Sequence, residues 1–400
     1  MVIHERNGMN SNRTSIIATT IGTFLAFFTF GTYDVLKSTT ISSILDEMQY
    51  SYSRSGLIIL ASYFGFVVAS LLTGFIAETV GKKTIVFIAI ICYLAGAYSY
   101  SSSQSLALFI LASFFLGFAA GSTELGCMSI ITNIHRHSPG LYLNLLTAFH
   151  GLGCMLAPLY AGAMFRAGFT WRNVYSYSII VPLAVLLYFT FARYPKLDET
   201  AASRFDFRNI LKTAFTPTMR WVYVLCCAYT ATEVVIATWL VEYLRILHGV
   251  PIESASTWLS IYFGGIMAGR LVGGFLVERV GYMRSIAFAI IACIACILLG
   301  VSGTLTLAYL LPVTGLFLSI IFPTSLALVA TLGFKNLGPI IGLFLCFVGV
   351  GGMIGPWIAG QVNDALGLNF GMGTAVLFCA IMLFALYRIK KSISAPAKSA

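Results

Sequence analysis

Residues 73–81 read TGFIAETVG, and residues 273–281 read GGFLVERVG. Glycine, phenylalanine, glutamate, valine and glycine recur in register, and basic residues follow both copies. A second pair of segments, GCMLAPLYAG at 153–162 and GGMIGPWIAG at 351–360, repeats at nearly the same offset. Similarity at a fixed spacing indicates a repeated structural unit. Because the repeat unit is half of the 400-residue chain, the sequence predicts two homologous halves.

The composition is that of a membrane protein. Apolar residues make up 58% of the chain and charged residues only 10%, with a mean hydropathy of +0.90. A soluble domain usually has about 25% charged residues. Residues 84–123 and 285–334 contain no Asp, Glu, Lys or Arg, and each stretch is long enough for two membrane spans of about 20 residues. We therefore expect an all-α polytopic membrane protein.

Apolar runs bounded by charged or turn residues predict twelve transmembrane helices. They lie near residues 14–44, 54–78, 83–100, 106–133, 139–165, 172–193, 217–246, 252–279, 285–302, 306–333, 337–363 and 370–389. A long polar segment falls between the sixth and seventh spans. The chain is thus predicted to divide into two pseudo-symmetric six-helix halves, at 1–193 and 217–400, joined by a cytoplasmic linker at 194–216.

Lysine and arginine gather on one side of the predicted spans. The loops on the side of the two termini carry eighteen of them, whereas the opposite loops carry only Arg54, Arg166, Arg172 and Arg245. Positive residues mark the cytoplasmic side of membrane proteins, so we expect a multi-pass protein of the cell membrane with both termini in the cytoplasm. The net charge of +10 is spread over these loops, which argues against nucleic acid as a partner.

The repeated loop resembles a motif of the major facilitator superfamily, whose loop between spans 2 and 3 has the form G-x-x-x-D/E-x-x-G-R/K-K/R. The first copy here has Gly74, Glu78, Gly81, Lys82 and Lys83, and the second has Gly274, Glu278, Arg279, Gly281 and Arg284. The usual aspartate of the first copy is replaced by Glu78. Together with the six-plus-six arrangement, the motif implies a transporter of this superfamily rather than an enzyme.

Further segments resemble the fucose/glucose–proton symporter group of that superfamily. They are GFAAGSTELGCMSIITN (117–133), NLLTAFHGLGCMLAPLYAG (144–162), AYTATEVVIATWLVEYL (228–244), YFGGIMAGRLVGGF (262–275) and GLFLSIIFPTSLAL (315–328). Members of this group couple substrate uptake to a proton, or sometimes to sodium, through acidic residues in spans 1 and 4. The resemblance therefore implies a small-molecule solute and a proton as partners.

Glu124 is the leading candidate for proton coupling. It lies near the middle of span 4, where a charge is costly and is retained mainly for function. Gly117, Gly121 and Gly126 flank it and permit close helix approach. A carboxyl group in such a setting is suited to reversible protonation. The alternative is a structural ion pair that locks two helices together.

Asp34 and Lys37 lie three residues apart in span 1 and share a helix face. Asp34 matches the span 1 acid of the sugar–proton symporters, so the resemblance implies a role in proton coupling. Lys37 departs from that pattern. It could hold Asp34 ionised, leaving Glu124 as the only proton carrier, or it could contact an anionic substrate. A purely structural pair of the two residues is the alternative.

Substrate contacts are expected near the midplane, between the repeated halves. Glu233 occupies in span 7 the position that Asp34 holds in span 1, and Trp239 follows two turns later as a possible platform for a sugar ring. An interfacial position is the alternative for Trp239. Asn144 and His150 are further candidates, and a histidine satisfied by a neighbouring carbonyl is the alternative for His150.

The loop motif and Arg270 are predicted to form a gate. Gly74 and Gly274 would let spans 2 and 11, and spans 8 and 5, approach closely. Glu78 and Glu278 would pair with arginines or helix N-termini across the cytoplasmic closure. We assign Arg270 to this gate rather than to the substrate site.

The sequence thus predicts a monomeric secondary transporter for proton-coupled uptake of a sugar or similar small polar solute. Proton-driven efflux of hydrophobic or cationic compounds is the alternative. Many amides and one or two indoles in the cleft would favour sugar, and a wide apolar, aromatic cleft would favour drugs. No catalytic triad, metal-ligand cluster or phosphate-binding loop appears, so we expect no enzymatic activity, cofactor or metal. The nine cysteines lie in apolar runs and are interpreted as packing residues.

Overall fold

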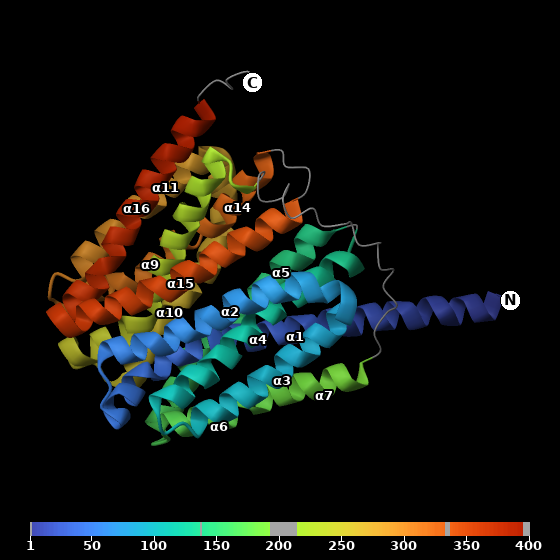
Figure 1. The fold of residues 1–400 in the computed structure, drawn as a ribbon, viewed down its shortest axis with the longest axis horizontal. Coiled ribbons are helices and arrows are strands. Elements are labelled where there is room, and N and C mark those ends of the chain that lie inside the picture. Colours follow the sequence, from blue (N-terminus) through green and yellow to red (C-terminus); the bar gives the residue numbers. More distant parts are fainter. Residues whose placement is uncertain (1, 137, 193–213, 333–336, 395–400) are drawn as a thin grey trace.

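A computed structural model describes residues 2–136, 138–192, 214–332 and 337–394, and its described residues form helices and connecting turns (Figure 1). The side chains at 2–13, 74–79, 330, 337–339 and 394 lie outside the described part. The first half contains α1 (Val2–Met48), α2 (Tyr52–Val80), α3 (Lys82–Ser101), α4 (Leu106–Ile134), α5 (Pro139–Arg166), α6 (Trp171–Ser178) and α7 (Ile180–Phe191). The second half contains α9 (Pro217–His248), α10 (Ile252–Val280), α11 (Tyr282–Gly300), α12 (Leu305–Ala308), α13 (Leu310–Leu318), α14 (Ile321–Thr331), α15 (Leu337–Leu366) and α16 (Leu368–Ser394).

These helices provide twelve segments long and apolar enough to cross a membrane, which confirms the predicted fold class. The sixth span, Trp171–Phe191, consists of α6 and α7, and the tenth, Leu305–Val329, of α12 to α14. The remaining spans are each a single helix. Most of the predicted linker, residues 194–213, lies outside the described residues, so its boundaries stay a prediction.

The helix packing repeats between the halves. In the first half α1 packs against α5 and α2 against α4, and in the second half α9 packs against α15 and α10 against α13. The two halves meet mainly through α2 with α15 and α5 with α10. Figure 1 shows α2 and α15 side by side along this boundary. The helix bundle has two ends. We call one the far end, where α1 finishes and α2 begins. We call the other the terminal end, where α1 begins and α16 finishes.

The repeated segments at 153–162 and 351–360 supply the close helix approaches inside each half. A Cβ atom on Gly153 of α5 would lie 2.3 Å from the carbonyl oxygen of Phe28 in α1. A Cβ atom on Gly351 of α15 would lie 2.0 Å from the carbonyl oxygen of Cys227 in α9. Only glycine permits backbones to approach this closely. The repeat is therefore a matched pair of backbone contacts, one in each half.

The last glycine of each repeated segment makes the contact between the halves. A Cβ on Gly162 of α5 would lie 3.1 Å from the carbonyl oxygen of Glu253, at the start of α10. A Cβ on Gly360 of α15 would lie 2.8 Å from the carbonyl oxygen of Tyr52, at the start of α2. Both contacts lie toward the far end. The same motif thus joins helices within a half at its first glycine and joins the two halves at its last.

The predicted close approach at Gly274 is wrong for this conformation. A Cβ built on Gly274 would meet no atom within 4 Å, and the neighbouring Phe275 side chain is 75% exposed. The surroundings of Gly74 and the side chain of Glu78 lie outside the described part of the structure. The described glycine contacts between α5 and α10 run from Gly162 with Glu253 to Gly151 with Met267, and the face of α10 that carries Gly274 meets no described helix beyond them.

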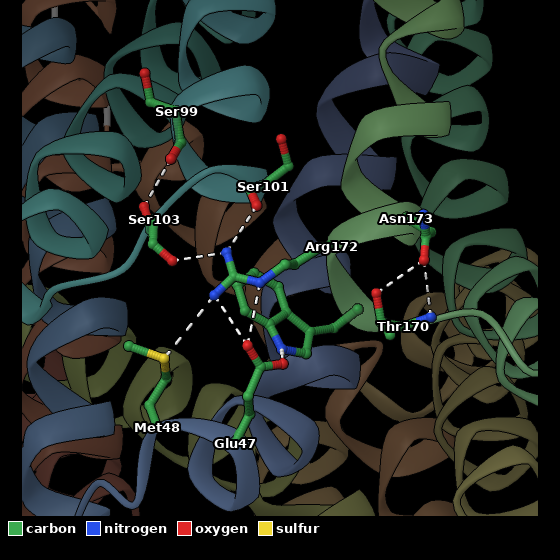
Figure 2. Close-up of polar contacts among 9 residues, drawn as sticks. Glu47, Met48, Ser99, Ser101, Ser103, Thr170, Arg172 and Asn173 are labelled. Carbon is green, nitrogen blue, oxygen red and sulfur yellow. Dashed lines mark hydrogen bonds and ion pairs between the residues drawn. The ribbon is translucent and has the colours of Figure 1, made fainter.

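Arg172 holds three helices of the first half together at the far end (Figure 2). Its guanidinium donates to the carbonyls of Ser101 and Ser103 at 2.9 and 2.7 Å, which covers the C-terminus of α3. It also pairs with Glu47 of α1 at 2.9 Å. The indole of Trp171 donates to the other Glu47 oxygen at 2.7 Å. A cation at a helix C-terminus and a two-point contact with a carboxylate both favour this arrangement.

The close approach of α15 to α9 can be tested with alanine substitutions in one helix. Gly351→Ala would force the α9 and α15 backbones apart and is expected to destabilise the fold by about 1–3 kcal/mol. Gly342→Ala is the matched control, because a Cβ there would meet nothing within 4 Å. The midpoint of thermal unfolding in detergent should fall for Gly351→Ala and stay unchanged or rise for Gly342→Ala. Equal midpoints for the two variants would contradict the contact.

Candidate functional site

A cavity of about 160 Å³ lies between the two halves. A single water needs only roughly 10–15 Å³ of such space, so the cavity can admit a larger solute. Side chains from both halves line it: Phe27, Phe30, Asp34, Val35, Lys37, Ser38, Ile59, Tyr63, Phe66, Glu124, Met128, Thr147, His150, Tyr229, Thr230, Glu233, Val234, Ala237, Phe263, Arg270, Phe322, Leu345 and Val348. Ionisable side chains and aromatic rings dominate this lining.

Five of the predicted site residues meet in this cavity. Asp34 and Lys37 come from α1, Glu124 from α4, His150 from α5 and Glu233 from α9. They are up to about 200 residues apart in the chain, and the repeat brings Asp34 of the first half and Glu233 of the second half to the same cavity. The structure therefore places the predicted proton-coupling residues and three of the predicted substrate contacts around one space.

Two predicted substrate contacts lie elsewhere. Trp239 is fully buried, its indole nitrogen donates to the carbonyl of Pro356 at 3.3 Å, and its ring packs edge-on against Tyr52. It belongs to the contact between α9, α15 and α2 and does not line the cavity. Asn144 is exposed on the terminal part of α5 and is also absent from the cavity lining. The rotation of α9 turns Trp239 away from the cavity. Asn144 lies one turn nearer the terminal end than Thr147, which does line the cavity, so its depth along α5 separates it from the site.

Arg270 lies in the cavity and not beside Glu278. Its charge acts on both Glu124 and Glu233, and the guanidinium Nε is buried without a hydrogen-bond partner among the described residues. Glu278 is exposed one turn from the end of α10. The interpretation of Arg270 as a gate residue therefore does not match its position in this conformation. Eight residues along a helix separate two side chains by about 12 Å along the axis, which is too far for a direct pair.

The polar side chains of α1 find partners on neighbouring helices. Lys37 is 3% exposed, and its ammonium donates to the Ser62 hydroxyl of α2 at 2.6 Å. Within the described part of the chain, no carboxylate oxygen lies within 4.0 Å of it. The Asp34 carboxylate lies 3.8 Å from His150 Nε2 on α5. Lys37 thus depends on a single hydroxyl for its short contacts.

Two cavity tyrosines were not predicted from the sequence. Tyr63 of α2 and Tyr229 of α9 line the cavity, and the buried Tyr229 side chain interacts with Glu233 and Arg270. Tyr229 lies one helical turn before Glu233, on the same face, and that spacing could have identified it. No comparable signal marks Tyr63, because its neighbours in α2 are apolar or small residues on every face of the helix.

The loop motif has a local role that the structure makes clear. Gly81 and Gly281 are each the single residue between two helices, with φ of 86° and 91°. Side chains other than glycine rarely adopt such positive φ values. Lys82 begins α3, with Lys83 next to it. The motif therefore makes a one-residue turn at the terminal end of each half.

A polar network closes the far end. Glu242 of α9 is buried, accepts a hydrogen bond from Ser42 of α1 and pairs with Arg245 at 3.1 Å. Arg245 pairs in turn with Asp46 of α1 at 2.7 Å. The Tyr52 hydroxyl donates to Glu242 at 3.3 Å. These contacts connect the first half to the second through Arg245, which is shared between the buried carboxylate of Glu242 and the exposed carboxylate of Asp46.

Asp364 adds a second link at the same end. Its two carboxylate oxygens accept hydrogen bonds from the backbone amides of Tyr52 and Ser53 at 2.8 and 2.9 Å. These amides open α2, so a carboxylate of α15 caps a helix of the other half. Free amides and the helix dipole both favour a negative charge there. The sequence offered no signal for this cap, because the partners are more than 300 residues apart.

Comparison with known proteins identifies the family. The model of the Major Facilitator Superfamily matches residues 19–332 and 248–400. The chain belongs to the major facilitator superfamily. It is therefore a membrane transporter rather than an enzyme, as predicted.

Relatives in this superfamily include sugar transporters. A glucose/galactose transporter of Brucella abortus biovar 1 (strain 9-941) is 24% identical over 387 residues, covering 90% of this chain and 91% of the relative. The L-fucose-proton symporter of Escherichia coli (strain K12) is 22% identical over 389 residues, covering 86% and 88%. These similarities confirm the predicted resemblance to the fucose/glucose–proton symporter group.

Solved structures of the superfamily share the fold. A bacterial homologue of the human lysosomal transporter Spinster, inward-facing and occupied, has a TM-score of 0.80 at 15% identity, with 96% of this chain and 98% of that chain covered. The transporter FucP in the outward conformation has a TM-score of 0.65 at 19% identity, with 94% and 99% covered. The shared fold extends over nearly the whole chain.

The partner of Lys37 can be tested on α2. Ser62→Ala removes the hydroxyl that Lys37 contacts and is expected to destabilise this superfamily member by about 1–3 kcal/mol, because a buried polar group loses its partner. Ser55→Ala is the matched control on the same helix, since the buried Ser55 hydroxyl has no partner among the described residues. Thermal unfolding in detergent should show a lower midpoint for Ser62→Ala only. A similar loss for Ser55→Ala would argue that helix packing, not Lys37, explains the effect.

Proposed function

We propose that this protein takes up a sugar or similar small polar solute together with a proton, by alternating access. The observation that carries the proposal is the cavity between the halves. It gathers Asp34, Glu124 and Glu233 from three helices of both halves, and a polar network closes it at the far end. A charged site at the interface of two repeats is the arrangement expected of a secondary transporter.

Glu124 is proposed as the proton carrier, with Asp34 assisting. Glu124 lines the cavity at mid-span, and the charges of both Asp34 and Arg270 act on it. Two carboxylates close together disfavour double ionisation, while the cation favours it. Binding or release of a proton would therefore change how Arg270 is shared between Glu124 on one half and Glu233 on the other. That sharing would link protonation to the relative position of the halves.

The solute is proposed to bind between the carboxylates. Glu233, Lys37 and His150 offer charged and hydrogen-bonding groups, and Phe30, whose ring centroid lies 4.3 Å from that of His150, offers a flat apolar face. Sugars present hydroxyl groups together with apolar ring faces, so such a mixture suits them. The similarity to a glucose/galactose transporter and to the L-fucose-proton symporter supports the same substrate class.

Alternating access is supported by the asymmetry of the contacts. The described ion pairs and hydrogen bonds between the halves lie at the far end or beside the cavity, and Gly274 near the terminal end meets no partner helix. The better fold match to an inward-facing transporter than to outward-facing FucP agrees with closure at one end. With the termini in the cytoplasm, this conformation would be open inward. The motif around Gly74, Glu78 and Glu278 would then form its gate contacts when the terminal end closes.

Efflux of hydrophobic or cationic compounds in exchange for protons is the second candidate. It is favoured by one observation: the described cavity lining contains no asparagine, glutamine or tryptophan, and phenylalanine and tyrosine rings from five helices line the space. Proton-driven uptake of labelled glucose, galactose or fucose by the protein in vesicles would favour the first candidate. Proton-driven extrusion of a lipophilic cation, with no sugar uptake, would favour the second.

The proton role of Glu124 can be tested in proteoliposomes. Glu124→Gln is expected to abolish solute accumulation driven by a pH gradient, because the amide cannot exchange a proton, while solute exchange without a gradient continues. Glu253→Gln is the matched control, since Glu253 lies at the far-end start of α10 and not in the cavity. Unchanged accumulation by Glu124→Gln would rule out its coupling role.

The far-end closure can be tested by hydrogen–deuterium exchange. Asp364→Ala removes the cap on α2 and is expected to speed amide exchange at the starts of both α2 and α10, because loss of the link lets the halves separate. A purely local effect would speed exchange at the start of α2 alone. Ser105→Ala, which removes the cap of α4 inside the first half, should leave the start of α10 unchanged. Asp364→Asn, which keeps an acceptor, should restore much of the protection.

A further inference from the structure

Three side chains with metal-binding chemistry meet at one wall of the cavity. Asp34 of α1 and His150 and Cys154 of α5 each offer one ligand atom, and these atoms all lie within 4.8 Å of one another. His150 Nε2 is 3.8 Å from the Asp34 carboxylate and 3.7 Å from Cys154 Sγ. Nitrogen, oxygen and sulfur ligands in one cluster are characteristic of zinc and similar borderline ions, not of magnesium or calcium.

We propose that Asp34, His150 and Cys154 bind a zinc-class divalent cation at the wall of the transport cavity. In a tetrahedral site with metal–ligand bonds of about 2.0–2.3 Å, neighbouring ligand atoms lie roughly 3.3–3.6 Å apart. The two shortest separations here are within a few tenths of an ångström of that range. Side-chain rotation alone can close the difference. The fourth position faces the cavity and is available to water or a solute.

The backbone holds the three residues in place. His150 and Cys154 lie four residues apart, so they share one face of α5. A Cβ on Gly31 would lie 2.0 Å from the His150 carbonyl oxygen, and the backbone amide of Cys154 is 3.0 Å from the same point. The α1 and α5 backbones are therefore in contact beside the ligands. All three belong to the first half, so movement of the halves would leave the site intact.

The surrounding charges allow a cation. Arg270 acts on both His150 and Cys154 and disfavours a second positive charge, as does Lys37 one turn from Asp34. The carboxylate of Glu233 also acts on Cys154, and that of Asp34 acts on Glu124. Three acidic side chains, Asp34, Glu124 and Glu233, thus line the same cavity as Lys37 and Arg270. These acidic side chains would offset the charge of a bound divalent cation.

Occupation of this site would inhibit transport. A bound cation would use the Asp34 carboxylate and His150 nitrogen and would narrow the cavity. The site would therefore serve for inhibition by zinc-class ions, which would compete with the solute and the proton for Asp34 and His150. Its existence does not depend on which solute the protein carries.

Cobalt(II) provides a direct probe, because a thiolate ligand gives an intense charge-transfer band. The full-length protein in detergent, without solute or gradient, is expected to bind one Co²⁺ with this band, and excess Zn²⁺ should displace it. Cys154→Ser should lose the band, and His150→Gln should weaken binding by roughly tenfold or more. Cys127→Ser, which removes another buried thiol on α4, should behave as the wild type.

A second measurement distinguishes loss of metal binding from misfolding of a variant. Zn²⁺ should raise the thermal midpoint of the wild type and of Cys127→Ser, because a ligand of the folded state stabilises it, but not that of Cys154→Ser. His150→Cys, which exchanges one zinc ligand for another, should regain binding relative to His150→Gln. An unchanged cobalt spectrum in Cys154→Ser, an equal loss in Cys127→Ser, or no cobalt binding by the wild type would each overturn the proposal.

Discussion

Ionisable side chains inside an apolar bundle constrain the whole structure. A charge at the middle of a membrane is costly, so Asp34, Lys37, Glu124, Glu233 and Arg270 need both partners and a polar space. The structure meets this need by directing all five to one cavity between the halves. A cavity at this place makes the interface between the halves incomplete at the centre. The halves must then be joined elsewhere, and in this conformation they are joined at the far end.

The far-end closure and the central cavity are built from the same repeated helices. The repeated segments of α5 and α15 use their first glycine to hold α1 or α9 and their last to contact the opposite half. Polar groups then complete the closure through Glu242, Arg245 and Asp364. Backbone contacts inside each half are apolar and tight, so they resist change. The halves also pack through α2 with α15 and α5 with α10, but the described ion pairs and hydrogen bonds between them are few. These polar links can be exchanged for water when the halves separate.

One wall of the cavity carries two kinds of chemistry, the polar groups that face the space and a thiol behind them. Asp34 and His150 contribute charge and hydrogen bonding to the cavity, whereas Cys154 lies just behind it and is buried. A proton or a solute would engage the groups that face the space. A zinc-class ion would also recruit the thiol from the adjacent turn of α5. The tight packing of α1 on α5 places both kinds of chemistry within a few ångströms.

The pattern of residues close together in the chain determined the number of spans, the division into halves and most of the candidate residues of the cavity. The length and apolarity of each run set twelve spans, the repeat set two halves, and the rarity of intramembrane charges selected Asp34, Lys37, Glu124 and Glu233. Tertiary structure alone decided that Arg270 faces the cavity, that Trp239 faces a neighbouring helix, and that Asp364 caps α2. It also brought Cys154 and His150 to Asp34. The physical reason is that hydrophobic length depends on residues close in the chain. The rotation of a helix about its axis, and the end at which the halves close, depend on contacts between residues hundreds of positions apart.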